Sequence, residues 1–341
     1  MNKLNQLFIT LMLTIALTAC GEPPILPPAK PLSASQEQLQ QIPNIDKGQH
    51  QVVTIRDIIL FNADTERELE LSAFYPRIGE NFPLILFSHG NFSSKDKYDK
   101  IIEHWVSHGY VVVAPNHQDC CGMVSGIFNS LWYGNFGLVE QRMIDFKFLL
   151  GNLTQIEQKH PAFKNKANFN NIAATGHSFG AFSAQQYGGA GLYEPDTDKY
   201  HYINDDRIKA IVALSPPGPM FDVITKDSWN NLAKPMMLTT GTWDVDSQFF
   251  TEWQMHKMSF DKAKHNDKYA LITQGADHYL GNLICRPEKE QPPQTDALNM
   301  VNAATTSFLN AYMKRTKRDS MFLDFNDLAE LTNGFSIIEK R

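Results

Sequence analysis

The sequence predicts an α/β fold with a mostly parallel, eight-stranded sheet flanked by helices. From residue 51 onward, short β-branched runs alternate with amphipathic stretches, which is typical of parallel strands joined by crossover helices. The run Pro83–Ser88 (PLILFS) has no polar residue before its end, as expected of a strand that is buried on both faces. The chain has 341 residues, of which 43% are hydrophobic, and this is enough to form the core of one large domain.

Eight segments are predicted as strands, and the first two open the sheet as an antiparallel pair. They are Val52–Leu60, Leu69–Tyr75, Pro83–Ser88, Tyr110–Ala114, Asn171–Gly176, Ile208–Leu214, Pro235–Thr240 and Tyr269–Gln274. Apolar residues at helical spacing predict helices at Tyr98–Ser107, Phe136–Leu150 and Thr295–Met313. We therefore expect a single domain over residues 48–341, ending in a charged tail from about Lys314 with at most a short helix.

The N-terminus has the features of an export signal. Lys3 precedes the apolar run Leu7–Leu17, whose 11 residues are too few to span a bilayer, which takes about 20. The run ends in Leu17-Thr18-Ala19-Cys20-Gly21, which resembles the lipobox of bacterial lipoproteins. That resemblance implies that residues 1–20 are a lipoprotein signal and that Cys20 carries a lipid, at the outer membrane in a Gram-negative cell. The alternative is an ordinary signal peptide that contains a cysteine.

The composition of the chain also bears on the segment before the domain, on its binding partners and on its cysteines. Residues 21–47 are rich in Pro, Gln and Ser without hydrophobic periodicity, which predicts a flexible tether. The formal net charge is −6, so neither nucleic-acid binding nor electrostatic docking to anionic lipid is expected. In an oxidising compartment Cys285 is expected to pair with Cys120 or Cys121, because neighbouring cysteines pair only with strain; three buried thiols are the alternative.

The segment Gly176-His177-Ser178-Phe179-Gly180 follows a predicted strand and precedes a helical stretch. A serine is a poor nucleophile unless it lies on a tight, exposed turn beside a base. Glycines two residues before and after the serine let the strand and the helix approach at such a turn. The pattern therefore predicts Ser178 as a nucleophile, and a serine that only caps a helix is the weaker interpretation.

An acid and a histidine should follow Ser178 in the chain, each at the end of a later strand. Asp244 follows the strand that ends in Gly241-Thr242, and His278 follows the strand that ends in Gly275-Ala276. His278 is expected to take the proton of Ser178, and Asp244 to orient the imidazole. Asp246 is an alternative acid on the same loop. Asp277 is predicted as a loop residue because adjacent side chains seldom bond in triad geometry.

The oxyanion hole needs two backbone N–H groups near the serine. We expect one from Phe179 and one from Asn91, in the loop Ser88-His89-Gly90-Asn91 that follows the third strand. No metal or other cofactor is predicted, because there is no His-Glu-x-x-His helix and the histidines of the other loops lack metal-ligand spacing.

With these motifs in view, the chain resembles the α/β-hydrolase superfamily. The resemblance covers most of residues 80–285 and rests on FSHGNFSS, HWVSHGYVVVAPNHQD, GHSFGA, GTWD and GADHY. It is similar to platelet-activating factor acetylhydrolases, dienelactone-hydrolase-like proteins and cutinase-type serine esterases. The acetylhydrolases carry their acid directly after the sixth strand, where this chain has Ser215, so the resemblance implies that the acid has moved to Asp244.

These features predict a serine hydrolase that cleaves carboxylic acyl esters through an acyl-enzyme, with residues 48–341 as its catalytic domain. An alternative is a phospholipase A2-like enzyme, of the platelet-activating factor acetylhydrolase type, that removes short or oxidised acyl chains from phospholipids. An alternative of another class is a surface lipoprotein that uses the fold only for binding. The expected partners are a small-molecule or lipid ester and, through Cys20, the membrane of the bacterial cell envelope.

Overall fold

The computed structural model describes residues 24–247, 249–325 and 327–341. The predicted signal segment and Cys20 lie outside the described residues. Nine strands form the main sheet, in the order β1-β2-β4-β3-β5-β8-β9-β10-β11. They are β1 (Val52–Asn62), β2 (Arg67–Pro76), β3 (Phe82–Ser88), β4 (Val111–Pro115), β5 (Ala167–His177), β8 (Ile208–Leu214), β9 (Met236–Trp243), β10 (Lys268–Asp277) and β11 (Ser336–Lys340). A separate hairpin pairs β6 (Leu192–Glu194) with β7 (Lys199–His201).

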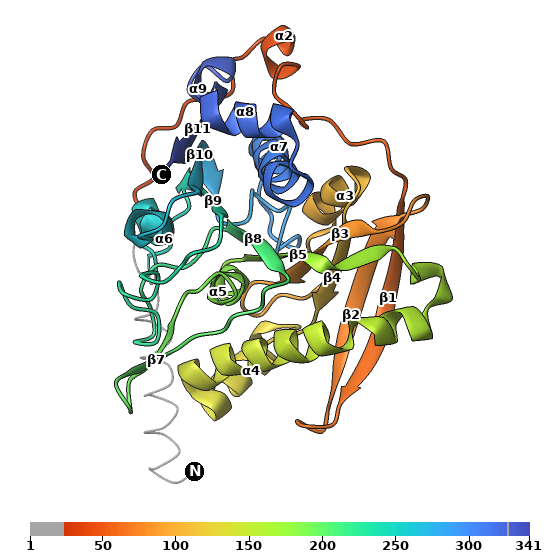
Figure 1. Cartoon of the computed structure of the whole chain (residues 1–341). Coiled ribbons are helices and arrows are strands. Elements are labelled where there is room, and N and C mark those ends of the chain that lie inside the picture. The colour runs from red at the N-terminus through yellow and green to blue at the C-terminus, as the bar shows by residue number, and fades with distance from the viewer. Residues whose placement is uncertain (1–23, 248, 326) are drawn as a thin grey trace, which may run out of the picture.

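The six central strands, from β4 to β10 in sheet order, are parallel, and β1 and β2 join them antiparallel at one edge. Helices cover both faces (Figure 1). They are α2 (Gln36–Leu39), α3 (Asp99–Ser107), α4 (Met123–Lys159), α5 (Phe179–Gln186), α6 (Met258–Lys262), α7 (Thr295–Leu309), α8 (Lys317–Phe325) and α9 (Leu328–Leu331). Short 3₁₀ turns lie at η1 (Pro161–Phe163) and η2 (Trp253–Lys257), and a π-turn, η3 (Asn310–Lys314), extends α7.

The core is divided by the sheet into two layers, because successive side chains of a strand point to opposite faces. In β3, Leu84 and Leu86 pack with α4 and α5, whereas Ile85 and Phe87 pack with α3 and α7. Both sets are fully buried, which explains why this strand reads as a continuous apolar run rather than an alternating one. The predicted α/β-hydrolase fold with a mostly parallel sheet is thus confirmed.

The C-terminal tail differs from its prediction. Instead of one short helix at most, it forms α8, α9 and the ninth strand of the sheet. β11 pairs antiparallel with β10 and covers what would otherwise be an exposed edge of the sheet. Ile338 is buried there, although three charged residues, Glu339, Lys340 and Arg341, follow it directly in the sequence. A strand that short and mixed carries no periodic signal of its own, which is why eight strands rather than nine were expected.

The predicted tether is also wrong over its described part, residues 24–47. The carbonyl of Pro27 accepts a hydrogen bond of 2.8 Å from the indole of Trp243, at the end of β9. Farther along, the short helix α2 has a capping box, and Ile42 is buried in the core layer of α3 and α7. Scattered apolar residues thus anchor a segment that its Pro- and Gln-rich composition alone predicts to be free.

The disulfide prediction is wrong as well. Cys120 and Cys121 are bonded to each other, and Cys285 keeps a buried thiol. In the turn that holds the pair, Cys121 has a left-handed φ of 77°. Cys285 instead lies beneath the loop that follows β3, where a Cβ added to Gly90 would come within 3.3 Å of its sulfur.

α4 contains a segment for which the sequence shows no clean periodicity. α4 consists of helical stretches separated by non-helical backbone at Gly134 and at Asn152, and the φ of 65° that makes the kink at Gly134 is tolerated because glycine has no side chain. Before the kink, Phe128, Leu131 and Trp132 are exposed. Within the described part of the chain, no helix combines the length and the apolar character that crossing a bilayer would require.

Candidate active site

The serine of the glycine-flanked motif lies at a sharp turn between β5 and α5. Ser178 has a φ of 53° and a ψ of −123°, a left-handed conformation that is rare for a residue with a side chain. A Cβ on Gly176 would lie 2.3 Å from the carbonyl oxygen of Gly180, and one on Gly180 would lie 2.2 Å from that of Ser88. Both positions therefore require glycine, and the strand–turn–helix context predicted for this motif is present.

The predicted acid and base are in contact. His278 Nδ1 donates a hydrogen bond of 2.7 Å to Asp244 Oδ1, and Thr240 Oγ1 donates one of 3.0 Å to the other carboxylate oxygen. Asp244 follows β9 and is buried, while His278 follows β10. Because parallel strands end at the same edge of a sheet, two residues 34 positions apart in the sequence meet there.

Charge and burial act on this pair in opposite directions. Burial by itself would raise the pKa of Asp244, but the two imidazoles beside it, those of His256 and His278, favour its charged form and hold that pKa well below its usual range. Burial lowers the pKa of His278, against the opposing attraction of Asp244. His278 is therefore held neutral near pH 7. Its Nδ1 proton points at the carboxylate, which leaves Nε2 free to accept a proton.

His278 also lies beside the residue that precedes the serine. Its ring centroid is 4.7 Å from that of His177, and His177 Nε2 donates a hydrogen bond of 2.9 Å to the carbonyl oxygen of His278. Because Nε2 of His177 carries the ring proton, Nδ1 can only accept, and it accepts a hydrogen bond of 3.1 Å from the Tyr98 hydroxyl. The same hydroxyl accepts a hydrogen bond of 2.8 Å from the Gly90 N–H. This chain of bonds links the histidine loop, the turn of Ser178 and the loop after β3.

Asp246 and Asp277, the carboxylates next to the predicted acid and base, accept hydrogen bonds from backbone N–H groups of their own loops. Asp246 accepts a hydrogen bond of 3.1 Å from the N–H of Phe249 within its own loop. Asp277 accepts from the N–H groups of Tyr279 and Gly281 at 2.8 and 2.9 Å, which closes the turn after β10. The hydrogen bond of His278 Nδ1 goes to Asp244.

The two residues predicted to supply the oxyanion N–H groups lie directly after Ser178 and in the loop that follows β3. Phe179 is the first residue of α5, where a helix has N–H groups without an acceptor of its own. Asn91 lies in a turn in which the N–H of Ser93 bonds to the carbonyl of Gly90 at 3.1 Å. The carbonyl of Asn91 accepts from Arg286 at 3.3 Å, which restrains this turn from the outside.

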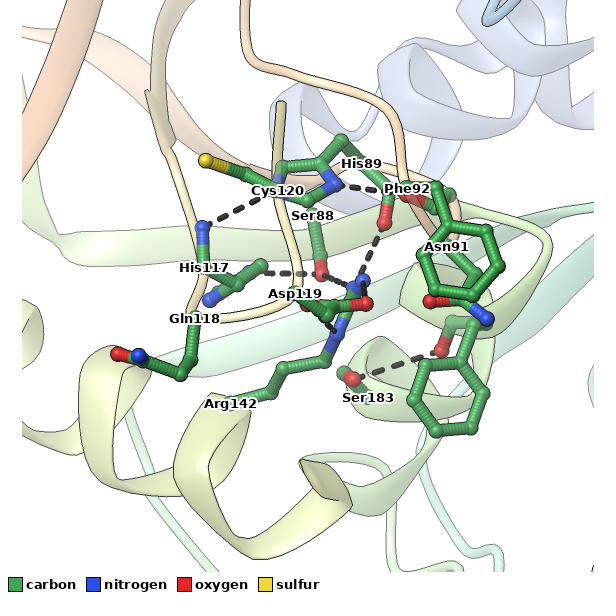
Figure 2. A network of polar contacts seen from close by, with 12 residues as sticks. Ser88, His89, Asn91, Phe92, His117, Gln118, Asp119, Cys120, Arg142 and Ser183 are labelled. Atoms are coloured by element: carbon green, nitrogen blue, oxygen red, sulfur yellow. Dashed lines mark hydrogen bonds and ion pairs between the residues drawn. The ribbon is translucent and has the colours of Figure 1, made fainter. Parts of the chain in front are cut away.

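A buried arginine that the sequence analysis missed contacts both of the elements that are predicted to supply the oxyanion N–H groups (Figure 2). Arg142 of α4 forms a two-pronged ion pair with Asp119, at 3.1 and 2.6 Å. Its Nη1 donates to the carbonyl oxygen of His89 at 2.6 Å and to Ser88 Oγ at 3.0 Å. The guanidinium carbon lies 5.0 Å from the centre of the Phe179 ring. Arg142 thus contacts the loop of Asn91 and the residue that follows Ser178.

Two histidines complete this network. His117 Nδ1 donates a hydrogen bond of 2.9 Å to Asp145, and its Nε2 accepts one of 2.9 Å from the Ser88 hydroxyl, because burial keeps the pKa of this ring well below its usual value and the ring neutral. His89 Nδ1 donates to the carbonyl of Gly90 at 2.7 Å, and its Nε2 accepts from the N–H of His117 at 3.0 Å. Burial and the charge of Arg142 lower the pKa of His89 to about 4, so its ring is neutral near pH 7.

The spacing of α4 holds a signal for Arg142. This residue lies four positions after Leu138 and four before Phe146, so it belongs to the buried face of the helix. A charge on such a face needs a partner, and Asp119 is that partner. No pattern in the sequence marks the second missed residue, His256 of η2, which is buried against Asp244.

Nitrogen and oxygen atoms of Asp244, His256 and His278 lie within 4.8 Å of one another. Both imidazoles approach the same carboxylate oxygen, at 2.7 and 3.0 Å, which are hydrogen-bonding distances. An ion shared by these groups would need about 2.0 Å to each ligand atom and would have to displace the existing contacts. We therefore interpret the group as a carboxylate that is hydrogen-bonded to His278 and in close contact with a second imidazole, that of His256.

Comparisons with known proteins agree with this architecture. Residues 42–130 match a family model described as Chlorophyllase. The chain is 23% identical over 292 residues to the platelet-activating factor acetylhydrolase of Cavia porcellus, an alignment that covers 74% of this chain. It spans about three-fifths of that relative's length, 62%. At a coarse level both similarities point to an ester hydrolase. In its sheet, in its strand–turn–helix motif and in these similarities, the chain resembles the α/β-hydrolase superfamily.

Proposed function

We propose that this protein is a serine hydrolase that cleaves carboxylic acyl esters through a triad of Ser178, His278 and Asp244. Ser178 Oγ attacks the ester carbonyl carbon while His278 Nε2 takes the hydroxyl proton. The C–O bond to the leaving group then breaks, and the leaving alkoxide receives that proton from His278. Water, deprotonated in turn by His278, hydrolyses the acyl-serine and releases the acid. Asp244 keeps the imidazole oriented and stabilises its charged form.

The observation that carries this proposal is the 2.7 Å bond between His278 and Asp244 at the same sheet edge as the strained turn of Ser178. The N–H groups of Phe179 and Asn91 are the proposed donors to the oxyanion. Their supports are consistent with that role, because a hole that is already ordered needs no rearrangement during the reaction. The network around Arg142 supplies such order on the side of His89 and Phe179.

For the substrate we propose acyl esters with an apolar acyl chain. Next to Phe179, the ring of Phe221 lies at a centroid distance of 6.4 Å and itself contacts Phe249 at 6.0 Å. These aromatic rings supply an apolar wall beside the serine turn. A phospholipase A2-like activity on short or oxidised phospholipid chains is the second candidate, and the name of the acetylhydrolase relative favours it.

A fluorophosphonate probe tests the proposal, because it phosphonylates only an activated serine. We expect labelling of the folded protein, mapped by mass spectrometry to the peptide of Ser178, and no labelling of Ser178→Ala or of heat-denatured protein. Turnover of p-nitrophenyl acetate and of a short-chain phosphatidylcholine by the same sample then separates the two candidate activities. A folded protein that neither labels nor hydrolyses any ester would support the non-catalytic alternative and end the proposal.

We also propose that the protein is anchored to the cell envelope through a lipid on Cys20, and the support for this is the lipobox-like sequence Leu17–Gly21. In a Gram-negative host fed an alkynyl fatty acid, the wild-type chain should incorporate the label, and Cys20→Ser should not. Cys285→Ser is the matched control, because its thiol is buried and its removal should leave labelling intact. Equal labelling of wild type and Cys20→Ser would contradict the anchor.

A further inference from the structure

His256 lies where the ends of two neighbouring strands meet. It belongs to η2, the short turn between β9 and β10, and its side chain is fully buried. One ring nitrogen, Nδ1, is 2.8 Å from the carbonyl oxygen of Pro216, just beyond β8. The other, Nε2, is 3.0 Å from Asp244 Oδ1, just beyond β9. His256 thus bridges the end of β8 and the carboxylate bonded to His278.

Both neighbours of this ring are acceptors. A carbonyl and a carboxylate can only accept a hydrogen bond, and a neutral imidazole has only one N–H to donate. A neutral His256 would therefore point a lone pair at an acceptor in a site without water access, which is costly. The Nε2 contact is short but too poorly aligned for a regular hydrogen bond, so it is best described as an ion pair. An ion pair needs a charged ring.

We propose that His256 is a positioning residue that carries two protons in the resting enzyme and, as a cation, holds Asp244 in place for His278. This inference rests on the proposed function, in which Asp244 is the acid. His256 itself touches neither the serine nor the reacting atoms. Its role is to attach the carboxylate to the end of β8 and to share its negative charge with His278.

The surroundings of the ring support the charge. Burial lowers the pKa of His256, but Asp244 more than reverses this and raises it above its ordinary value. The other titratable group that faces it is His278, at a centroid distance of 5.5 Å, with His177 beyond. Phe250 covers one side of the ring at 4.4 Å and brings no charge. The adjacent Lys257 turns away to pair with Asp261 and Glu339.

A cation at this position has a consequence for His278. The two rings share one carboxylate, so a charge on His256 makes a second positive charge on His278 less favourable, and it lowers the pKa of His278. His278 then stays an uncharged base to a lower pH than it would beside an unshared carboxylate. The acidic limb of the pH profile of kcat/KM reports the pKa of the base in the free enzyme. With His256 charged, this limb is expected to lie at a lower pH than it would without that charge.

The charge can be observed without any assay of activity. Nitrogen-15 NMR of histidine-labelled full-length protein distinguishes protonated from bare ring nitrogens. At pH 7, where an ordinary histidine is mostly singly protonated, we expect both nitrogens of His256 to be protonated, with the signals identified by their loss in His256→Gln. If that variant does not fold, the contacts of the ring with Phe250 identify the signals in the wild type. A singly protonated His256 at pH 7 would overturn the proposal.

Kinetics then test the effect on the base. In His256→Gln the acidic limb of kcat/KM should move to higher pH by about one unit, because the neighbouring cation is gone. His265→Gln, a change at an exposed histidine, is the matched control and should leave the profile unchanged. A lowered kcat with an unmoved acidic limb would reduce His256 to a structural residue and refute the inference. If the wild type hydrolyses no ester while His256 carries two protons, the proposed function fails and the charge assignment stands.

Discussion

Replacing Asp244 by asparagine should lower kcat for ester hydrolysis by about 10⁴-fold, the loss seen when the acid of a serine-protease triad is changed in this way. The carboxylate accepts from His278, from Thr240 and, as an ion pair, from His256. An asparagine has one oxygen for these donors, and its amide would donate to one of the partners. The His278 ring would then lose the tautomer in which Nε2 is free to accept the proton of Ser178.

Asp246→Asn is the matched control, because it makes the same chemical change two residues away. Its carboxylate serves its own loop through the N–H of Phe249, so kcat should stay within about threefold of the wild type, a change of under 1 kcal/mol in the barrier. Steady-state kinetics with one p-nitrophenyl ester at pH 7.5 measures both variants. A larger loss in Asp246→Asn than in Asp244→Asn would show that the acid lies at residue 246.

Replacing Arg142 by methionine should affect both stability and turnover. The change leaves Asp119 as a buried charge without its partner, which costs about 3–5 kcal/mol in the free energy of unfolding. It also removes the bond to the carbonyl of His89 and the contact with the ring of Phe179. With the two oxyanion elements no longer held, kcat should fall about 10²-fold, at the lower end of the effect of losing one oxyanion donor.

Urea unfolding and steady-state kinetics together measure this variant. If Arg142 positions the oxyanion hole, KM should change much less than kcat, because the lost interaction matters in the transition state. Arg56→Met is the control, since Arg56 pairs with Asp96 and Asp99 at the surface and its loss should cost at most about 1 kcal/mol. An Arg142→Met protein that is destabilised but keeps its kcat would contradict the role in the oxyanion hole.

Much of the fold could be predicted because its signals are local. Each of the eight predicted strands is present, with ends that differ by a few residues, and the helix predicted from Thr295 begins there. The motif around Ser178 was recognisable because its two glycines are required by contacts within a few residues, between β5, α5 and the end of β3. The pairing of Asp244 with His278 followed from their places after parallel strands, which end at one edge of the sheet.

What could not be predicted depends on partners that are distant in the sequence. Cys285 is linked to the loop of Cys120 and Cys121 through Ser93, which donates to the carbonyl of Cys285 and accepts from the N–H of Cys121, yet the two neighbouring cysteines pair with each other. β11 forms only because the edge of β10 accepts it, and the segment at residues 24–47 is held by contacts with Trp243 and with the core. Composition and periodicity carry no information on such pairings.

By itself, the sequence determined the fold class, the order of the main strands and the positions of Ser178, Asp244 and His278 at the ends of elements. These follow from hydrophobic period and turn chemistry, which act over a few residues. Only the tertiary structure decided which buried charges meet: Arg142 with Asp119, and His256 with Asp244. A buried charge must find its partner across the fold, wherever the chain places it, because leaving it unpaired away from water costs several kcal/mol, roughly 3–5.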